Sequence, residues 1–288
     1  MSCGELRRAV VSISDTHIRA WEEGRRDSPK DFEDLVGDIL DSHAELVVLN
    51  GDILDQKAGE KEIDFFLSQV AILTAAGRQV VFVKGNNEDN LSVNKQNRLY
   101  VGLGDEKHKG RVHVLENEHV VLTLHDGTKI SIVGTSAVLS PEEAKELAKF
   151  KLEHQPGELQ RRTEEAFYPG YKNALDASKN SELPTLLVFH NPPLVGSYPE
   201  HFKTALGVIH PTKFEEALDP STIFAIVSGH LHRGHLPGIF FYTTESGIPV
   251  FDVALPVAHG ITVLDLPISL EAVPNAQQEI TRQFESRS

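Results

Sequence analysis

The chain has 288 residues, of which 40% are hydrophobic and 24% charged, and these fractions exclude a coiled coil, a collagen and a wholly disordered chain. Its 28 basic and 42 acidic residues give a net charge of −14, which argues against coating nucleic acid or binding anionic membrane surfaces. The single cysteine, Cys3, excludes an intramolecular disulfide and a cysteine-based metal cluster, so a cytoplasmic location is expected.

The first third of the chain alternates strand and helix patterns. Short apolar runs predict strands over residues 9–13, 46–49 and 80–83. Apolar residues at helical spacing predict helices over residues 31–40 and 63–73 between them. This β-α-β-α-β order indicates a parallel sheet with right-handed crossovers. No apolar run approaches the roughly 18 residues of a membrane span, and no targeting segment is expected.

The middle of the chain has a different pattern. Apolar runs at residues 120–124 and 129–133 flank Asp126-Gly127, which predicts a β-hairpin. The highly charged segment 141–179 opens with a capping-box pattern and is predicted to be mostly helical. It is either a solvated helical pair or an insertion that covers a site.

Strand patterns return in the last third of the chain. They lie at residues 185–189, 224–227, 250–253 and 261–264. A helix is predicted near residues 212–218, and residues 271–288 are expected to form a polar tail. We therefore expect one domain over residues 1–270 that contains two packed sheets.

Polar side chains follow five of the predicted strands at their carboxyl ends, where open α/β sheets bind ligands. The residues concerned are Asp15, His17, Asp52, Asn86, His190, His230 and His232. This mixture of carboxylate, amide and imidazole suits Zn, Fe or Mn better than Mg or Ca. Seven such side chains exceed what one open metal site takes, whereas two metal ions that share a carboxylate would use them all.

The series Asp15-x-His17, Gly51-Asp52, Gly85-Asn86, His190 and Gly229-His230-x-His232 resembles the calcineurin-like metallophosphoesterase family. The resemblance implies a mixed α/β fold, a four-layer α/β/β/α sandwich with a dinuclear metal site. It implies that Asp15, His17, Asp52 and His232 hold the first metal, that Asp52 bridges, and that Asn86, His190 and His230 complete the second. It also implies that a metal-activated hydroxide attacks phosphorus, without a phosphoenzyme or an organic cofactor.

One position departs from the family pattern. The histidine that commonly follows the metal-binding asparagine contacts substrate in the family and is assigned as the general acid, and here it is Asn87. An asparagine can donate a hydrogen bond but delivers no proton at neutral pH. Asn87 is therefore a candidate for catalysis and substrate binding beside Asp52, and Tyr198 and His201 are candidates for substrate binding. His201 could also be a substitute proton donor, or simply a surface histidine.

The favoured function is a metal-dependent phosphodiesterase that hydrolyses a small or nucleotide-like phosphate ester. The alternative is a binding or scaffold protein of the same fold whose catalysis is weakened, and Asn87 motivates it. A nuclease is a third hypothesis, and the net charge of −14 weighs against it.

Overall fold

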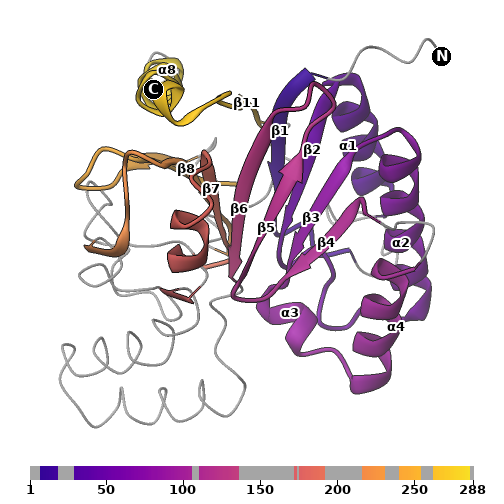
Figure 1. Cartoon of the computed structure of the whole chain (residues 1–288). Coiled ribbons are helices and arrows are strands. Elements are labelled where there is room, and N and C mark those ends of the chain that lie inside the picture. Colours follow the sequence, from indigo (N-terminus) through magenta and orange to yellow (C-terminus); the bar gives the residue numbers. More distant parts are fainter. Residues whose placement is uncertain are drawn as a thin grey trace, which may run out of the picture.

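The computed structural model describes residues 7–18, 29–105, 110–135, 172–173, 175–191, 216–230, 240–253 and 262–285. Within these ranges two mixed β-sheets pack against each other, with helices outside them (Figure 1). The predicted fold class, a mixed α/β sandwich of two packed mixed sheets flanked by helices, is confirmed. None of the helices in these ranges has the length and apolar character that crossing a membrane requires.

The first sheet has the strand order β11-β1-β2-β3-β4. Its strands are β1 (Arg7–Ile13), β2 (Ala44–Asn50), β3 (Gln79–Val83), β4 (Val112–Leu115) and β11 (Thr262–Asp265). Strands β1 to β4 are parallel, as predicted for the first three, and β11 pairs antiparallel with β1. Helices α1 (Pro29–Asp41), α2 (Glu60–Ala75) and α4 (Val93–Leu103) cover the outer face of this sheet (Figure 1).

The second sheet has the order β5-β6-β7-β8-β10-β9. Its strands are β5 (Glu118–Thr123), β6 (Lys129–Thr135), β7 (Thr185–Phe189), β8 (Ile223–Ser228), β9 (Phe240–Thr243) and β10 (Pro249–Asp252). The predicted hairpin is confirmed: β5 and β6 pair antiparallel, and Gly127 between them has a φ of 84°. Strands β6, β7, β8 and β10 are parallel, so the carboxyl ends of β7 and β8 lie at one edge.

The apolar strands of the first sheet are buried on both faces because this sheet lies between its helices and the second sheet. In β3, Val80 and Phe82 belong to the core under the helices, whereas Val81 and Val83 belong to the core between the sheets. Successive side chains of a strand point to opposite faces, so a continuous apolar run supplies both cores at once. Strand β2 alternates in the same way, with Val47 and Leu49 in the core under the helices and Leu46 and Val48 in the core between the sheets.

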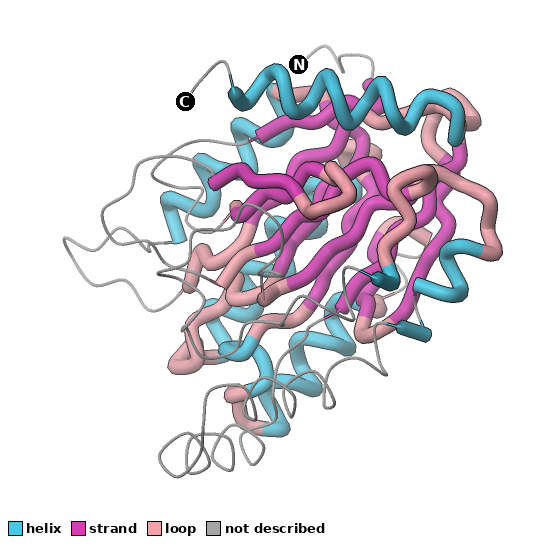
Figure 2. Tube along the Cα trace, turned by 90° about the vertical axis from the view of Figure 1, so that its left-hand side faces the viewer, coloured by secondary structure: helices cyan, strands magenta, loops and turns pink. Residues whose placement is uncertain are grey.

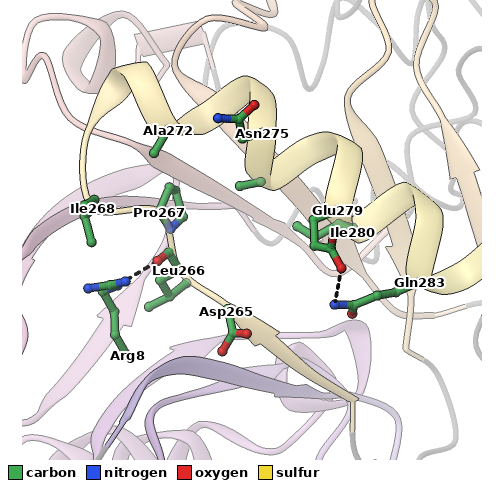
Figure 3. A pocket seen from close by; sticks show the side chains of 11 residues that line it. Arg8, Asp265, Leu266, Pro267, Ile268, Ala272, Asn275, Glu279, Ile280 and Gln283 are labelled. Atoms are coloured by element: carbon green, nitrogen blue, oxygen red, sulfur yellow. Dashed lines mark hydrogen bonds between the residues drawn. The ribbon is translucent and has the colours of Figure 1, made fainter.

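The C-terminal segment is a helix, and the expectation of a polar tail over residues 271–288 is wrong for residues 273–285. Helix α8 (Val273–Glu285) lies across the strands (Figure 2). Val273 and Ile280 are buried in the core between the sheets. Between α8 and β11 lies a shallow cavity of about 260 Å³, at whose wall Arg8 Nε donates to Leu266 O at 2.8 Å (Figure 3).

Other predictions fall partly outside the described residues. Of the charged segment 141–179, only residues 172–173 and 175–179 are described, and they are helical. The helix expected near residues 212–218 is described from residue 216 onward. The sequence patterns did not predict α3 (Asn86–Asp89), α4, β4 or β9. One domain over residues 1–270 stays a prediction.

Candidate metal centre

The candidate ligands meet where the strands end. Asp15 and His17 follow β1, Asp52 follows β2, and Asn86 opens α3 after β3. His190 directly follows β7, and His230 follows β8. Backbone hydrogen bonds join the loops after β1 and β2, among them those from Asp15 N to Gly51 O and from His17 N to Asp52 O, both 3.0 Å. Three other candidates, His232, Tyr198 and His201, lie outside the described residues.

Two groups of potential ligand atoms share Asp52. Ligand atoms of Asp15, His17 and Asp52 lie within 4.8 Å of one another, and so do those of Asp52, His190 and His230. His190 Nε2 lies 3.5 Å from Asp52 Oδ1 and 3.3 Å from Asn86 Oδ1, so Asn86 faces the second group. This arrangement has the donor atoms for two cations with one shared carboxylate.

The buried charge of the site fits the same interpretation. Asp15 and Asp52 are only 1% and 2% exposed, and burying two carboxylates close together is costly unless positive charge compensates them. His190 is fully buried, and burial disfavours its charged form. The Asp52 and Asp15 carboxylates outweigh that effect and raise the pKa of His190 to about 9. The buried carboxylates therefore favour the binding of positive charge between these loops.

The backbone at the candidate ligands adopts left-handed conformations. The φ angles are 57° at Asp15, 46° at His17, 52° at Asp52 and 69° at His230. Residues with side chains rarely adopt such angles, and each costs about 1–3 kcal/mol where the surrounding structure imposes it. Such strain is concentrated at functional sites, so its occurrence at four candidate ligands supports a binding role for this loop cluster.

Two glycines allow the loops to approach one another. A Cβ atom on Gly85 would overlap the Asp52 side chain, and one on Gly229 would overlap the side chains of Ser14 and Asp15. At both positions the neighbouring loop therefore occupies the space that a side chain would need. The glycines before Asn86 and His230 are required by this close packing.

Ser14 and His230 fix the carboxylate of Asp15. Ser14 Oγ lies 2.5 Å from Asp15 Oδ2 and 2.7 Å from Asn50 O. The backbone N–H of His230 donates to the same Oδ2 atom at 2.7 Å. Asp15 Oδ1 lies 3.8 Å from His17 Nε2 and so faces the first ligand group.

His190 is oriented by the backbone of β2. Its Nδ1 lies 3.0 Å from Asn50 O, which can only accept, so Nδ1 carries the hydrogen. Nε2 is thereby the nitrogen that faces Asp52 and Asn86. A backbone carbonyl that fixes the tautomer in this way is typical of metal-binding histidines. The His230 ring packs against His190 with centroids 5.1 Å apart.

Glu88 holds three loop amides together, a role that was not predicted from the sequence. Its carboxylate accepts hydrogen bonds from Gly85 N at 2.7 Å, Asp52 N at 2.9 Å and Leu54 N at 2.9 Å. Burial and the neighbouring Asp52 carboxylate raise the pKa of Glu88 to about 7. The Gly85-x-x-Glu88 spacing of a capping box was the sequence signal that could have identified it.

Asn87 contacts three candidate ligands through its backbone N–H and its side-chain carboxamide. Its backbone N–H donates to Asp52 Oδ1 at 2.8 Å. Its Nδ2 lies 2.6 Å from His17 Nδ1, and its Oδ1 accepts from Asn86 Nδ2 at 3.2 Å. The residue is 8% exposed, so little of it is open to solvent.

Comparisons with known proteins point to one family. The family model for calcineurin-like phosphoesterases matches residues 9–234. A crystal structure of a dimetal phosphatase from Danio rerio is similar to this chain at 16% identity and a TM-score of 0.58, covering 91% of this chain and 93% of that one. At this identity the likeness shows the fold alone. No curated protein matches the chain.

Two further solved structures match the chain at lower TM-scores. A putative 5′-nucleotidase from Staphylococcus aureus, in complex with alpha-ketoglutarate, has 14% identity and a TM-score of 0.47, covering 85% of this chain and 48% of that one. The sulfate thiohydrolase SoxB from Thermus thermophilus, in complex with glycerol, has 11% identity and a TM-score of 0.41, with coverages of 96% and 61%.

Proposed function

This chain belongs to the calcineurin-like phosphoesterase family, and we propose that it is a phosphodiesterase with a dinuclear metal centre. Its proposed substrate is a small, nucleotide-like phosphate ester. The observation that carries the proposal is the pair of ligand groups that share Asp52. We further propose that the protein works in the cytoplasm, on the basis of its composition.

The donor chemistry assigns each candidate residue to one of two ions. Asp15, His17 and Asp52 would hold the first, and His232 is proposed as its remaining ligand. The second ion would be held by Asp52, Asn86, His190 and His230. These carboxylate, amide and imidazole donors suit Mn, Fe or Zn. When bound, two such ions would polarise the phosphoryl oxygens and lower the pKa of a water molecule.

The residues around the ligands would maintain this arrangement during turnover. Ser14 and the His230 amide hold the Asp15 carboxylate, and Glu88 keeps the loops after β2 and β3 at a fixed separation. Such preorganised groups need no rearrangement when charge develops on a phosphoryl group.

Asn87, which stands where the family commonly has a histidine, favours substrates with a good leaving group. Asn87 cannot protonate a leaving group, and general acid catalysis typically contributes ~10²–10⁴-fold. A substrate whose leaving group departs readily as an anion tolerates that loss better than a substrate whose leaving group is a basic alkoxide. We propose a phosphodiester substrate with such a leaving group, and Tyr198 and His201 as further substrate contacts. A scaffold protein of the same fold is the second candidate function, because Asn87 is equally compatible with lost catalysis.

Hydrolysis of model esters by the reloaded protein separates the two functions. Metal-stripped protein is reloaded with Mn²⁺ and assayed with bis-(p-nitrophenyl) phosphate and p-nitrophenyl phosphate. We expect faster turnover of the diester, abolished in Asp52→Ala and retained in the control Asp34→Ala, an exposed carboxylate on α1. Two bound metal ions without turnover of either ester would favour the scaffold function.

A further inference from the structure

We propose that Asn87 is a positioning residue that holds the imidazole of His17 as a metal ligand, in place of the substrate contact expected from the sequence. The inference rests on the proposed metal centre and gives Asn87 a role in it. Asn87 Nδ2 lies 2.6 Å from His17 Nδ1.

The His17 ring has two nitrogens with different surroundings. Nε2 faces the first ligand group and lies 3.8 Å from Asp15 Oδ1. Nδ1 faces Asn87. An imidazole nitrogen binds a metal through its lone pair, so Nδ1 must carry the hydrogen when Nε2 is the ligand. Asn87 then has to present an acceptor to Nδ1.

A half-turn of the Asn87 carboxamide supplies that acceptor. The turn exchanges Nδ2 and Oδ1 without changing the shape of the side chain. At 2.6 Å the contact with His17 is shorter than the range of about 2.7–3.2 Å for N–H···O bonds, and an oxygen fits so close an approach better than a nitrogen does. With Oδ1 toward His17, Asn87 selects the tautomer whose Nε2 is free to bind.

The carboxamide has one oxygen and two neighbouring donors. Asn86 Nδ2 donates to Asn87 Oδ1 at 3.2 Å in the orientation described. Turning Oδ1 toward His17 gives up this longer hydrogen bond. An aspartate at position 87 would have an oxygen for each donor. Asn87→Asp is therefore predicted to hold His17 and Asn86 together better than the parent residue does.

The position of Asn87 in the fold suits a positioning role. It lies in the four-residue helix α3 and is 8% exposed. Its backbone N–H is bonded to Asp52 Oδ1, so the same residue fixes the shared carboxylate and the His17 ring. Residues that orient ligating histidines typically change metal affinity by ~10–100-fold when they are replaced.

Zn²⁺ binding, followed by calorimetry without substrate, tests the inference. We expect Asn87→Leu, which is similar in size but has no acceptor, to weaken binding of one of two ions by ~10–100-fold. Asn87→Asp should bind at least as tightly as the parent protein. Asn97→Leu and Asn97→Asp, at an exposed position on α4, are the matched controls for side-chain change and added charge.

The His17 tautomer gives a readout that needs no variant at position 87. In ¹⁵N-labelled, Zn²⁺-loaded parent protein, a long-range ¹H–¹⁵N spectrum should show hydrogen on Nδ1 of His17 and metal on Nε2, with His17→Gln used for assignment. Hydrogen on Nε2, or an Asn87→Leu variant that binds both ions as the parent does, would overturn the inference. Failure of the parent to bind Zn²⁺ would overturn both the inference and the proposed centre. Two bound ions with the expected tautomer but no ester hydrolysis would contradict the proposed function alone.

Discussion

Replacing Glu88 with alanine removes the acceptor that three buried backbone amides share. The amides of Gly85, Asp52 and Leu54 donate to it at 2.7, 2.9 and 2.9 Å. An orphaned buried donor costs about 1–3 kcal/mol, so three would cost about 3–9 kcal/mol. Because water entering the vacated space returns part of that, we expect a loss of about 3–5 kcal/mol, a large share of the ~5–15 kcal/mol of a typical domain.

Glu62 provides the matched control. It occupies the equivalent capping-box position of α2 and accepts one hydrogen bond, from Gly59 N at 2.8 Å. Glu62→Ala should therefore cost only about 1 kcal/mol. Urea unfolding of both variants in the presence of a chelator gives the two free energies of unfolding. Equal losses, or a loss below about 1 kcal/mol for Glu88→Ala, would refute the idea that Glu88 holds the loops together.

Three further predictions concern protons, close packing and the C-terminal helix. Because the pKa of His190 is raised to about 9, protonated His190 stabilises the metal-free protein fully below pH ~6.5, and this contribution is lost as the pH rises through 9. A bound Zn²⁺ ion needs the neutral imidazole, so Zn²⁺ affinity should increase between pH ~6.5 and 9. Calorimetry in buffers of different ionisation enthalpy should detect the proton that Zn²⁺ displaces, and no displaced proton would contradict this. Gly85→Ala should lower Zn²⁺ affinity at least ~10-fold, because its Cβ would overlap the carboxylate of Asp52. Gly37→Ala, in open space on α1, is the control and should raise the free energy of unfolding by roughly 0.5–1 kcal/mol. Ile280→Ala should cost about 2–5 kcal/mol in urea unfolding, against less than about 0.5 kcal/mol for the exposed Ile268, and equal costs would show that α8 is not part of the core.

The strands and the position of the candidate site could be predicted because both depend on local patterns. Strands β2 and β3 are apolar runs buried on both faces, and an apolar run bounded by polar residues is a strong signal. The polar residues that follow such runs are placed at one sheet edge by the parallel topology alone.

Other elements gave little local signal. Strand β4 lies at an edge of the first sheet, and its His113 and partly exposed valines obscure the apolar pattern. Helix α8 buries Val273 and Ile280 among polar residues, so its composition resembles a solvated tail. Capping-box spacing indicates the contact of Glu88 with Gly85 N, but the contacts of Glu88 with Asp52 and Leu54 join loops that are distant in sequence, and no spacing rule predicts them. The same holds for the contact of Asn87 with His17.

The division of the ligands between the two sheets has a consequence for folding. Asp15, Asp52 and Asn86 extend from the first sheet, whereas His190 and His230 extend from the second. The hydrogen bond from His230 N to Asp15 Oδ2 spans 215 positions of the chain. The complete donor set therefore forms only when the two sheets have docked and brought together segments that are distant in the chain. Metal ions that need this set would bind the folded chain and not the unfolded one, so their binding would add to the free energy of unfolding.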